Sequence, residues 1–182
     1  MRILGTNHCG ELRFTAFKRR GLFKDVLCRR DYAERVLASF ANQIQSEYYG
    51  GNRSMSIEGI ALEHFSAAPQ SDINSSSLPC PRHAVFHSFL SDDRKQDAVT
   101  TTANSKQLTS LLKNKQVLTT SLSTIWENTD GCAEQYICAS VLYLMSVISH
   151  IYSLIIDRGI SAPRHGKEVV DGLNAVDKRY IY

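Results

Sequence analysis

The sequence predicts an α/β protein in which helices flank a central mixed β-sheet. Two observations favour this class. From about residue 83 onward, short β-rich runs alternate with longer segments of helical periodicity, a pattern typical of a mostly parallel sheet with helices on its faces. The composition, 43% hydrophobic and 21% charged over 182 residues, fits one globular domain with a real core.

The expected elements follow in chain order. Strands are expected at 54–65, 83–93, near 122–128 and at 152–159, and helices at 97–115, 133–150 and 166–181. The strand near 122–128 should lie in the interior of the sheet, because apolar runs precede and follow Asp130. The proline- and serine-rich stretch 66–82 is expected to be a loop.

The segment 31–46 is ambiguous. Tyr32, Val36, Phe40 and Ile44 recur at intervals of four, which favours a helix, whereas "VLASFANQIQ" could equally form a strand. The sequence leaves both readings open.

The twenty residues 137–156 contain no formal charge, so their length alone permits a transmembrane helix. Four serines and His150 weigh against that reading. We expect instead a buried amphipathic helix that runs into a short strand. Its apolar stripe would comprise Ile137, Val141, Leu144, Ile148 and Ile151.

Positive charge is concentrated near the N-terminus. Residues 1–40 contain nine Lys/Arg and four acids, an excess of five, whereas the whole chain carries only +3. We expect residues 1–24 to form a basic segment that attracts phosphates, or simply a solvated arm. Five cysteines without a C-x-x-C pair suggest a reducing compartment, the cytoplasm or nucleus, or a nucleoid.

An acid stands where the strand near 122–128 opens into the next helix, in "WENTDGCAEQY". Asp130 could cap that helix by accepting a backbone N–H bond. Alternatively, Asp130 could join Asp31 and Asp171, from "CRRDYAERV" and "HGKEVVDGLN", at one edge of the sheet. Three such carboxylates would form a hard-oxygen site for Mg²⁺ or Mn²⁺.

The order of elements and acids resembles the RNase H-like fold of integrases and DDE/DDD transposases. In that fold one Asp lies on the first strand, a second just after the fourth, and a third acid on the helix after the fifth. "NTDG" at 128–131 is similar to the usual setting of the second acid. The resemblance implies that Asp31, Asp130 and Asp171 are catalytic metal ligands.

A closer similarity is to a group of largely uncharacterised transposon-derived proteins of this fold, and it covers about residues 30–175. Five segments match in order: "DYAE" at 31–34, "IQS" at 44–46, "SDD" at 91–93, "TDG" at 129–131 and "HGKEVVDG" at 165–172. By this resemblance, residues 25–182 would be a catalytic core, truncated at its C-terminus and without a separate DNA-binding domain.

The chain departs from the family pattern in front of the first acid. Arg29 and Arg30 precede Asp31, where apolar residues are usual, and this puts the first strand in question. The third acid raises a geometric problem as well. A regular helix over 168–181 would bury the stripe Val169, Leu173, Val176 and Tyr180, which turns Asp171 nearly opposite and leaves Glu168 on the flank. The resemblance favours Asp171, with Glu168 as the alternative.

Neighbouring polar residues have two readings each. His165 and Lys167 could contact the scissile phosphate or the DNA backbone, or belong to a polar loop. Asp92 and Asp93 could add a carboxylate to the metal site or cap the next helix. The histidines show no clean metal spacing and are interpreted as structural: His64, His83 and His87.

The resemblance implies divalent-metal-dependent cleavage or strand transfer of DNA phosphodiesters by a transposase- or integrase-like core. The alternative is a non-catalytic transposon-derived remnant or nucleic-acid-binding module of the same fold. DNA is the expected partner under both, a homo-oligomer is possible, and no membrane association is expected.

Overall fold

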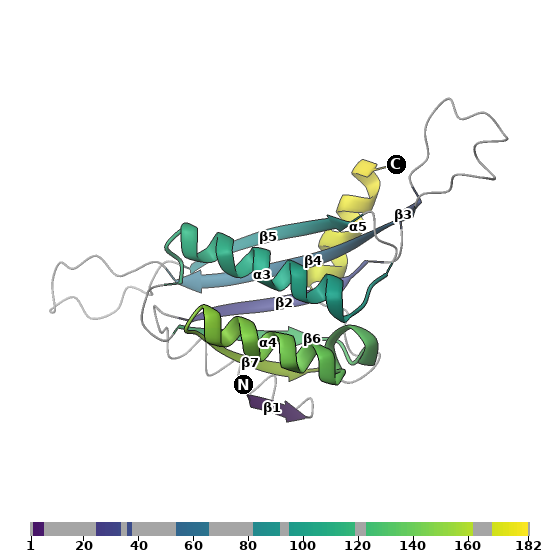
Figure 1. Ribbon diagram of the computed structural model, residues 1–182. Coiled ribbons are helices and arrows are strands. Elements are labelled where there is room, and N and C mark those ends of the chain that lie inside the picture. The colour runs from purple at the N-terminus through teal and green to yellow at the C-terminus, as the bar shows by residue number, and fades with distance from the viewer. Residues whose placement is uncertain are drawn as a thin grey trace, which may run out of the picture.

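The computed structural model describes residues 2–5, 25–33, 36–37, 54–65, 82–91, 95–118, 123–161 and 169–181. These residues form an α/β fold in which a mixed β-sheet carries helices on both faces, as the sequence predicted (Figure 1).

Seven strands of the described chain form the sheet. They are β1 (Arg2–Gly5), β2 (Val26–Tyr32), β3 (Val36–Leu37), β4 (Ser54–Phe65), β5 (Arg82–Ser91), β6 (Thr124–Thr129) and β7 (Ile155–Ile160). The order across the sheet is β1-β7-β6-β2-β4, and both β5 and the short β3 pair with β4.

Strand direction decides where the chain can build a site. β1, β7, β6 and β2 run parallel, whereas β4 is antiparallel to β2 and β5 is antiparallel to β4. The carboxyl ends of β2, β6 and β7 therefore meet at one edge of the sheet. In open α/β sheets this is the edge at which ligands usually bind.

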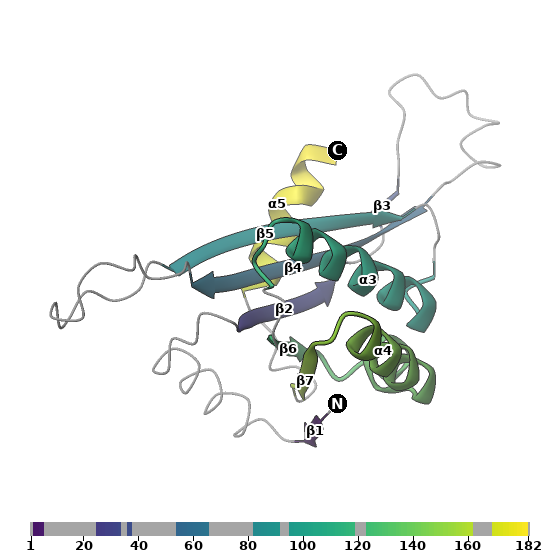
Figure 2. The same cartoon turned by 60° about the vertical axis from the view of Figure 1, so that its left-hand side comes forward.

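The helices divide between the two faces. α3 (Ala98–Asn114) and α4 (Ala139–Ile151) pack side by side on one face, and α5 (Val169–Ile181) crosses β4 and β2 on the other (Figures 1 and 2). A short π-helix, η1 (Ala133–Ile137), precedes α4. Asp97 caps α3, because its side chain accepts hydrogen bonds from the backbone N–H groups of Val99 and Thr100.

The main hydrophobic core lies between the sheet and the pair α3–α4. Alternate residues of the central strands point into it because side chains in a strand alternate between faces. Its members include Val26, Cys28, Ile60, Leu62, Leu108, Leu112, Ile125, Val141, Met145, Ile148 and Ile156.

Most predicted elements are confirmed. The strand at 54–65 has the predicted bounds, and β5, α3, β6, β7 and α5 fall where the pattern placed them. β6 lies between β2 and β7, in the interior of the sheet. In the ambiguous segment 31–46, the strand reading holds for the described residues, which end β2 and form β3.

The predicted helix at 133–150 is interrupted. Cys138 has an extended backbone and separates η1 from α4. The predicted apolar stripe is correct at Val141 and Ile148 but wrong at its ends, since Ile137 and Ile151 are exposed and Met145 is buried. The break at Cys138 shifts the helical phase, so the stripe cannot continue from Ile137.

The predicted buried stripe of α5 is wrong at Val176. Val170 and Asn174 are buried, whereas Val176 is 42% exposed. Gly59 in β4 explains why a polar residue faces the sheet: a Cβ at position 59 would stand 2.1 Å from Asn174 Oδ1. The missing side chain lets the helix approach the strand through Asn174, and this rotates Asp171 towards the sheet edge.

No helix in the described part of the chain is long and apolar enough to cross a membrane. Several predictions concern residues outside the described ranges. They are the basic segment apart from 2–5, the loop 66–81, and the positions Asp92, Asp93, His165, Lys167 and Glu168.

Candidate functional site

The register of the central strands brings two of the predicted acids together. β2 and β6 are adjacent and parallel, and Arg30 pairs with Thr129. Asp31 follows Arg30 on β2, and Asp130 follows Thr129 at the end of β6. Both acids therefore lie at the edge of the sheet formed by the carboxyl ends of these strands. The expectation that these two acids lie at neighbouring strand ends is therefore met by the register.

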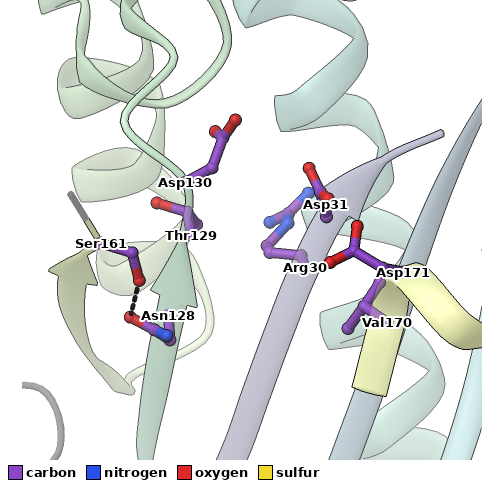
Figure 3. Close-up of a pocket in the computed structure, with 8 residues that line it drawn as sticks. All are labelled: Arg30, Asp31, Asn128, Thr129, Asp130, Ser161, Val170 and Asp171. Atoms are coloured by element: carbon purple, nitrogen blue, oxygen red, sulfur yellow. Dashed lines mark hydrogen bonds between the residues drawn. The ribbon is translucent and has the colours of Figure 1, made fainter. Parts of the chain in front are cut away.

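The third acid comes from α5, on the face of the sheet opposite α3 and α4. Asp171 lies in the first turn of α5, beside the buried Val170. It lines a small pocket together with Asp31 and Asp130. In Figure 3, Asp31 and Asp171 stand together on one side of this pocket, and Asp130 rises from the end of β6 on the other. Three segments far apart in sequence thus meet in one pocket.

Proximity of the carboxyl groups changes their acidity. The pKa of Asp31 is raised from 3.8 to about 7. Burial is the largest cause, followed by a hydrogen bond with Asp171 and repulsion from the negative charges of Asp130 and Asp171. Crowded acids that disfavour their own ionisation are typical of functional sites.

Asp130 also has a local structural role. Its Oδ1 accepts a hydrogen bond from the backbone N–H of Cys132 at 3.1 Å. The accepted N–H bond that the capping interpretation expects is present, but it stabilises the turn at Gly131 and does not cap η1, whose N-cap residue is Cys132. One oxygen of Asp130 serves this turn, and the carboxylate still lines the pocket.

Arg30 resolves the question about the first strand. It lies within β2 between Arg29 and Asp31, and its side chain is fully buried. Its guanidinium contacts Glu58 on β4 at 2.7 Å and Glu127 on β6 at 2.8 Å. A charged residue therefore occupies an interior strand position because two carboxylates pair with it.

The pocket has a neutral side as well as an acidic one. Asn128, Thr129 and Ser161 line it from the ends of β6 and β7. Ser161 Oγ donates to Asn128 Oδ1 at 3.4 Å, as Figure 3 shows. Thr129 Oγ1 is buried without a hydrogen-bond partner. Hydroxyl and amide groups can contact a phosphate without adding negative charge.

The three carboxyl groups of the pocket are the type of ligand that a hard divalent cation binds. Three carboxylates supply the oxygen ligands that Mg²⁺ and Mn²⁺ prefer. Within the described ranges, however, no group of three or more His, Cys, Asp or Glu side chains is already arranged to hold a metal ion. Asp130 must therefore rotate or shift towards Asp31 and Asp171 if the three are to share one ion.

Sequence reasoning found the three acids but missed most of their surroundings. Ser161 belongs to no motif, Asn128 stood out only as the first residue of "NTDG", and Arg30 only as a departure from the family pattern. Only their place in the sequence could have indicated them, because they stand at the ends of the parallel strands that also carry the acids or lie next to them. His165 and Lys167 remain predictions, because they lie outside the described residues.

Fold and site together define an α/β protein with an acidic pocket at the carboxyl edge of its sheet. Residues 13–182 match a family described as a domain of unknown function, DUF8701, and the chain belongs to that family. The comparisons with curated proteins and with solved structures gave no match.

Proposed function

We propose that this chain is a metal-dependent phosphodiester enzyme of the transposase or integrase kind, with an RNase H-like fold and DNA as its substrate. The observation that carries the proposal is the convergence of Asp31, Asp130 and Asp171 on one pocket. With β2, β4, β5, β6 and β7 counted as core strands, these acids lie on the first strand, after the fourth, and on the helix after the fifth. Those are the positions that the resemblance assigns to the ligands.

In this proposal the three carboxylates hold Mg²⁺ or Mn²⁺, and a bound ion of this kind activates a water or hydroxyl nucleophile and stabilises the leaving oxygen. The chain's own residues have separate tasks. Asn128 and Ser161 offer neutral hydrogen-bonding groups beside the acids, where a phosphate oxygen can approach without repulsion. His165 and Lys167 would contact the scissile phosphate or the backbone next to it.

The second candidate is a nucleic-acid-binding module or transposon remnant that lacks catalysis. One observation favours it: in the described part of the chain, the acids do not already form a metal-binding group. Such a module needs only basic surface for phosphates. The two candidates therefore differ in whether the acidic pocket matters.

A nicking assay on supercoiled DNA distinguishes them. The enzyme proposal predicts nicking that requires Mg²⁺ or Mn²⁺ and disappears in Asp130→Asn. Asparagine keeps an Oδ1 that can accept the Cys132 N–H bond, so the turn survives while the charged ligand is lost. Alanine would remove both and could not separate the two roles.

The matched control is Asp97→Asn, which likewise changes an acid that accepts backbone N–H bonds to its amide but lies at the start of α3. It should nick like the wild type. If the wild type binds DNA but shows no metal-dependent nicking, the binding-module candidate replaces the enzyme proposal.

A further inference from the structure

Four charged side chains form a continuous buried row beneath the pocket. Glu58, Arg30, Glu127 and Arg158 lie on the adjacent strands β4, β2, β6 and β7, so acid and base alternate across the sheet. Arg30 contacts both glutamates, and Arg158 Nε donates to Glu127 Oε2 at 2.7 Å. We call these four residues the charge row.

The surroundings oppose the effect of burial on the two central members of the row, Arg30 and Glu127. Burial alone would lower the pKa of Arg30, but Glu58 and Glu127 raise it well above its usual value. Burial alone would raise the pKa of Glu127, but Arg158 and Arg30 hold it below its usual value. The neighbours therefore favour the charged forms of Arg30 and Glu127 within the core.

Such a row is expected to contribute little net free energy to the stability of the fold. Desolvation of buried ion pairs commonly cancels their attraction, and apolar replacements of similar volume are often as stable or more so. A rigid, directional row is useful instead where strands must keep a fixed spacing. The strands that this row joins are those that deliver Asp31 and Asp130.

Arg158 holds both ends of the segment that carries Asp130. Its Nε donates to Glu127, three residues before Asp130, and its Nη1 donates to the backbone oxygen of Tyr136 at 3.0 Å, six residues after it. The planar, forked guanidinium can make both bonds at once. The loop with Asp130 is thus fixed on either side by one side chain.

Arg30 fixes the strand that carries the neighbouring acid, Asp31, to α3 and to the strands on either side. It is adjacent to Asp31 in the chain, and its Nη2 also donates to the backbone oxygen of Thr101 at 3.1 Å. Tyr136 is not charged but contacts the end of the row, because its hydroxyl donates a hydrogen bond to Glu58 Oε1 at 3.1 Å. Both arginines lie 5.9 Å from the Tyr136 ring centre.

We propose that Arg158, with Glu127 and Arg30, is a positioning residue that fixes Asp130 relative to Asp31. This inference rests on the proposed function for its consequence, namely metal affinity, but its geometric claim stands apart from it. In this inference the row acts through the two acids, and of its four members only Arg30 also lines the pocket.

The test uses Arg158→Lys in the full chain. Lysine keeps the positive charge beside Glu127 but cannot hold Glu127 and the Tyr136 carbonyl in one planar fork. The control is Ile156→Ala, on the same strand and buried in the core. It should lower the melting temperature, because it leaves a cavity in the core, without removing any contact of the row.

Two measurements decide the outcome. The first is hydrogen exchange of the Cys132 amide, which reports its bond to Asp130 and needs no metal. The second is the Kd for Mn²⁺ by calorimetry. Arg158→Lys should speed the exchange several-fold and weaken Mn²⁺ binding by about 10- to 100-fold, a range typical of groups that orient ligands. Ile156→Ala should weaken Mn²⁺ binding little.

Unchanged exchange in Arg158→Lys, or an equal loss of Mn²⁺ affinity in Ile156→Ala, would overturn the positioning role. If the wild type binds no Mn²⁺, the proposed function fails, while the exchange measurement still decides the geometric claim. The double variant Glu127→Gln/Arg158→Gln removes one charge of each sign and leaves Arg30 with Glu58. It should speed exchange in the same way if Arg158→Lys does not fold.

Discussion

Asp31 on β2 and Asp171 on α5 share a hydrogen bond between their carboxyl groups. Such a bond requires a proton, because two ionised carboxylates offer only acceptors. The raised pKa of Asp31 means that its carboxyl group keeps a proton to higher pH than an ordinary aspartate, with Asp130 close enough to add its repulsion. A divalent cation could take the place of that proton, and this exchange is the chemical basis of the proposed site.

Replacement of Asp31 by Asn should change the pH dependence of stability. The pKa of Asp31 is about 7 in the folded protein against 3.8 for an ordinary aspartate. Between these values the folded protein binds more protons than the unfolded chain, so its stability falls as the pH rises. Without metal, Asp31→Asn should melt like the wild type at pH 4 and at a higher temperature at pH 8. An equal difference at both pH values would contradict the assignment.

The identity of the third acid can be tested by paired variants. Asp171 lines the pocket and should be required, so Asp171→Asn should abolish metal-dependent nicking and weaken Mn²⁺ binding. Glu168→Gln, three residues earlier, should leave both near the wild-type level. The opposite pattern would transfer the role to Glu168, the alternative that the sequence left open.

The close approach of α5 to the sheet predicts contrasting effects of two glycines. Gly59→Ala would place a Cβ against Asn174 Oδ1 and should destabilise the fold by about 1–3 kcal/mol. Gly172→Ala is the control, because nothing lies within 4 Å of its Cβ position. Inside a helix that change should be neutral or stabilising by up to about 1 kcal/mol. Thermal or urea unfolding measures both, and equal effects would argue against this packing.

DNA binding and catalysis should respond to different residues. Replacement of Lys18, Arg19 and Arg20 by Ala should weaken binding to all DNA sequences and flatten its dependence on salt, because these charges displace counterions. Asp130→Asn should leave binding nearly intact or tighten it. Titrations at two salt concentrations measure both. A triple variant with unchanged salt dependence would remove the basic segment from the interface.

The sequence was informative wherever one periodicity ran through a whole element. β4 and α3 follow from such patterns, and the edge containing Asp31 and Asp130 follows from the rule that parallel strands end together. The resemblance then selected Asp171 as the third acid.

Pattern reading failed where a polar side chain is buried against a specific partner. Asn174 faces Gly59, more than a hundred residues away, and no helical periodicity reveals that contact. The charge row is hidden for the same reason. A charged residue in a strand is normally assigned to the solvent face, and the pairing of Arg30 with Glu127 depends on strands that are not consecutive in the chain.

Calorimetric titration with Mn²⁺ near pH 6, where Asp31 is still mostly protonated, tests most directly whether the acidic pocket is a metal site. The wild type and the capping control Asp97→Asn should bind Mn²⁺ with similar heat and release protons, since Asp31 must lose its proton when the ion binds. Asp130→Asn should abolish this signal while its circular dichroism spectrum stays unchanged. Absence of binding in the folded wild type, or equal binding in Asp130→Asn, would contradict the metal site on which the proposed function depends.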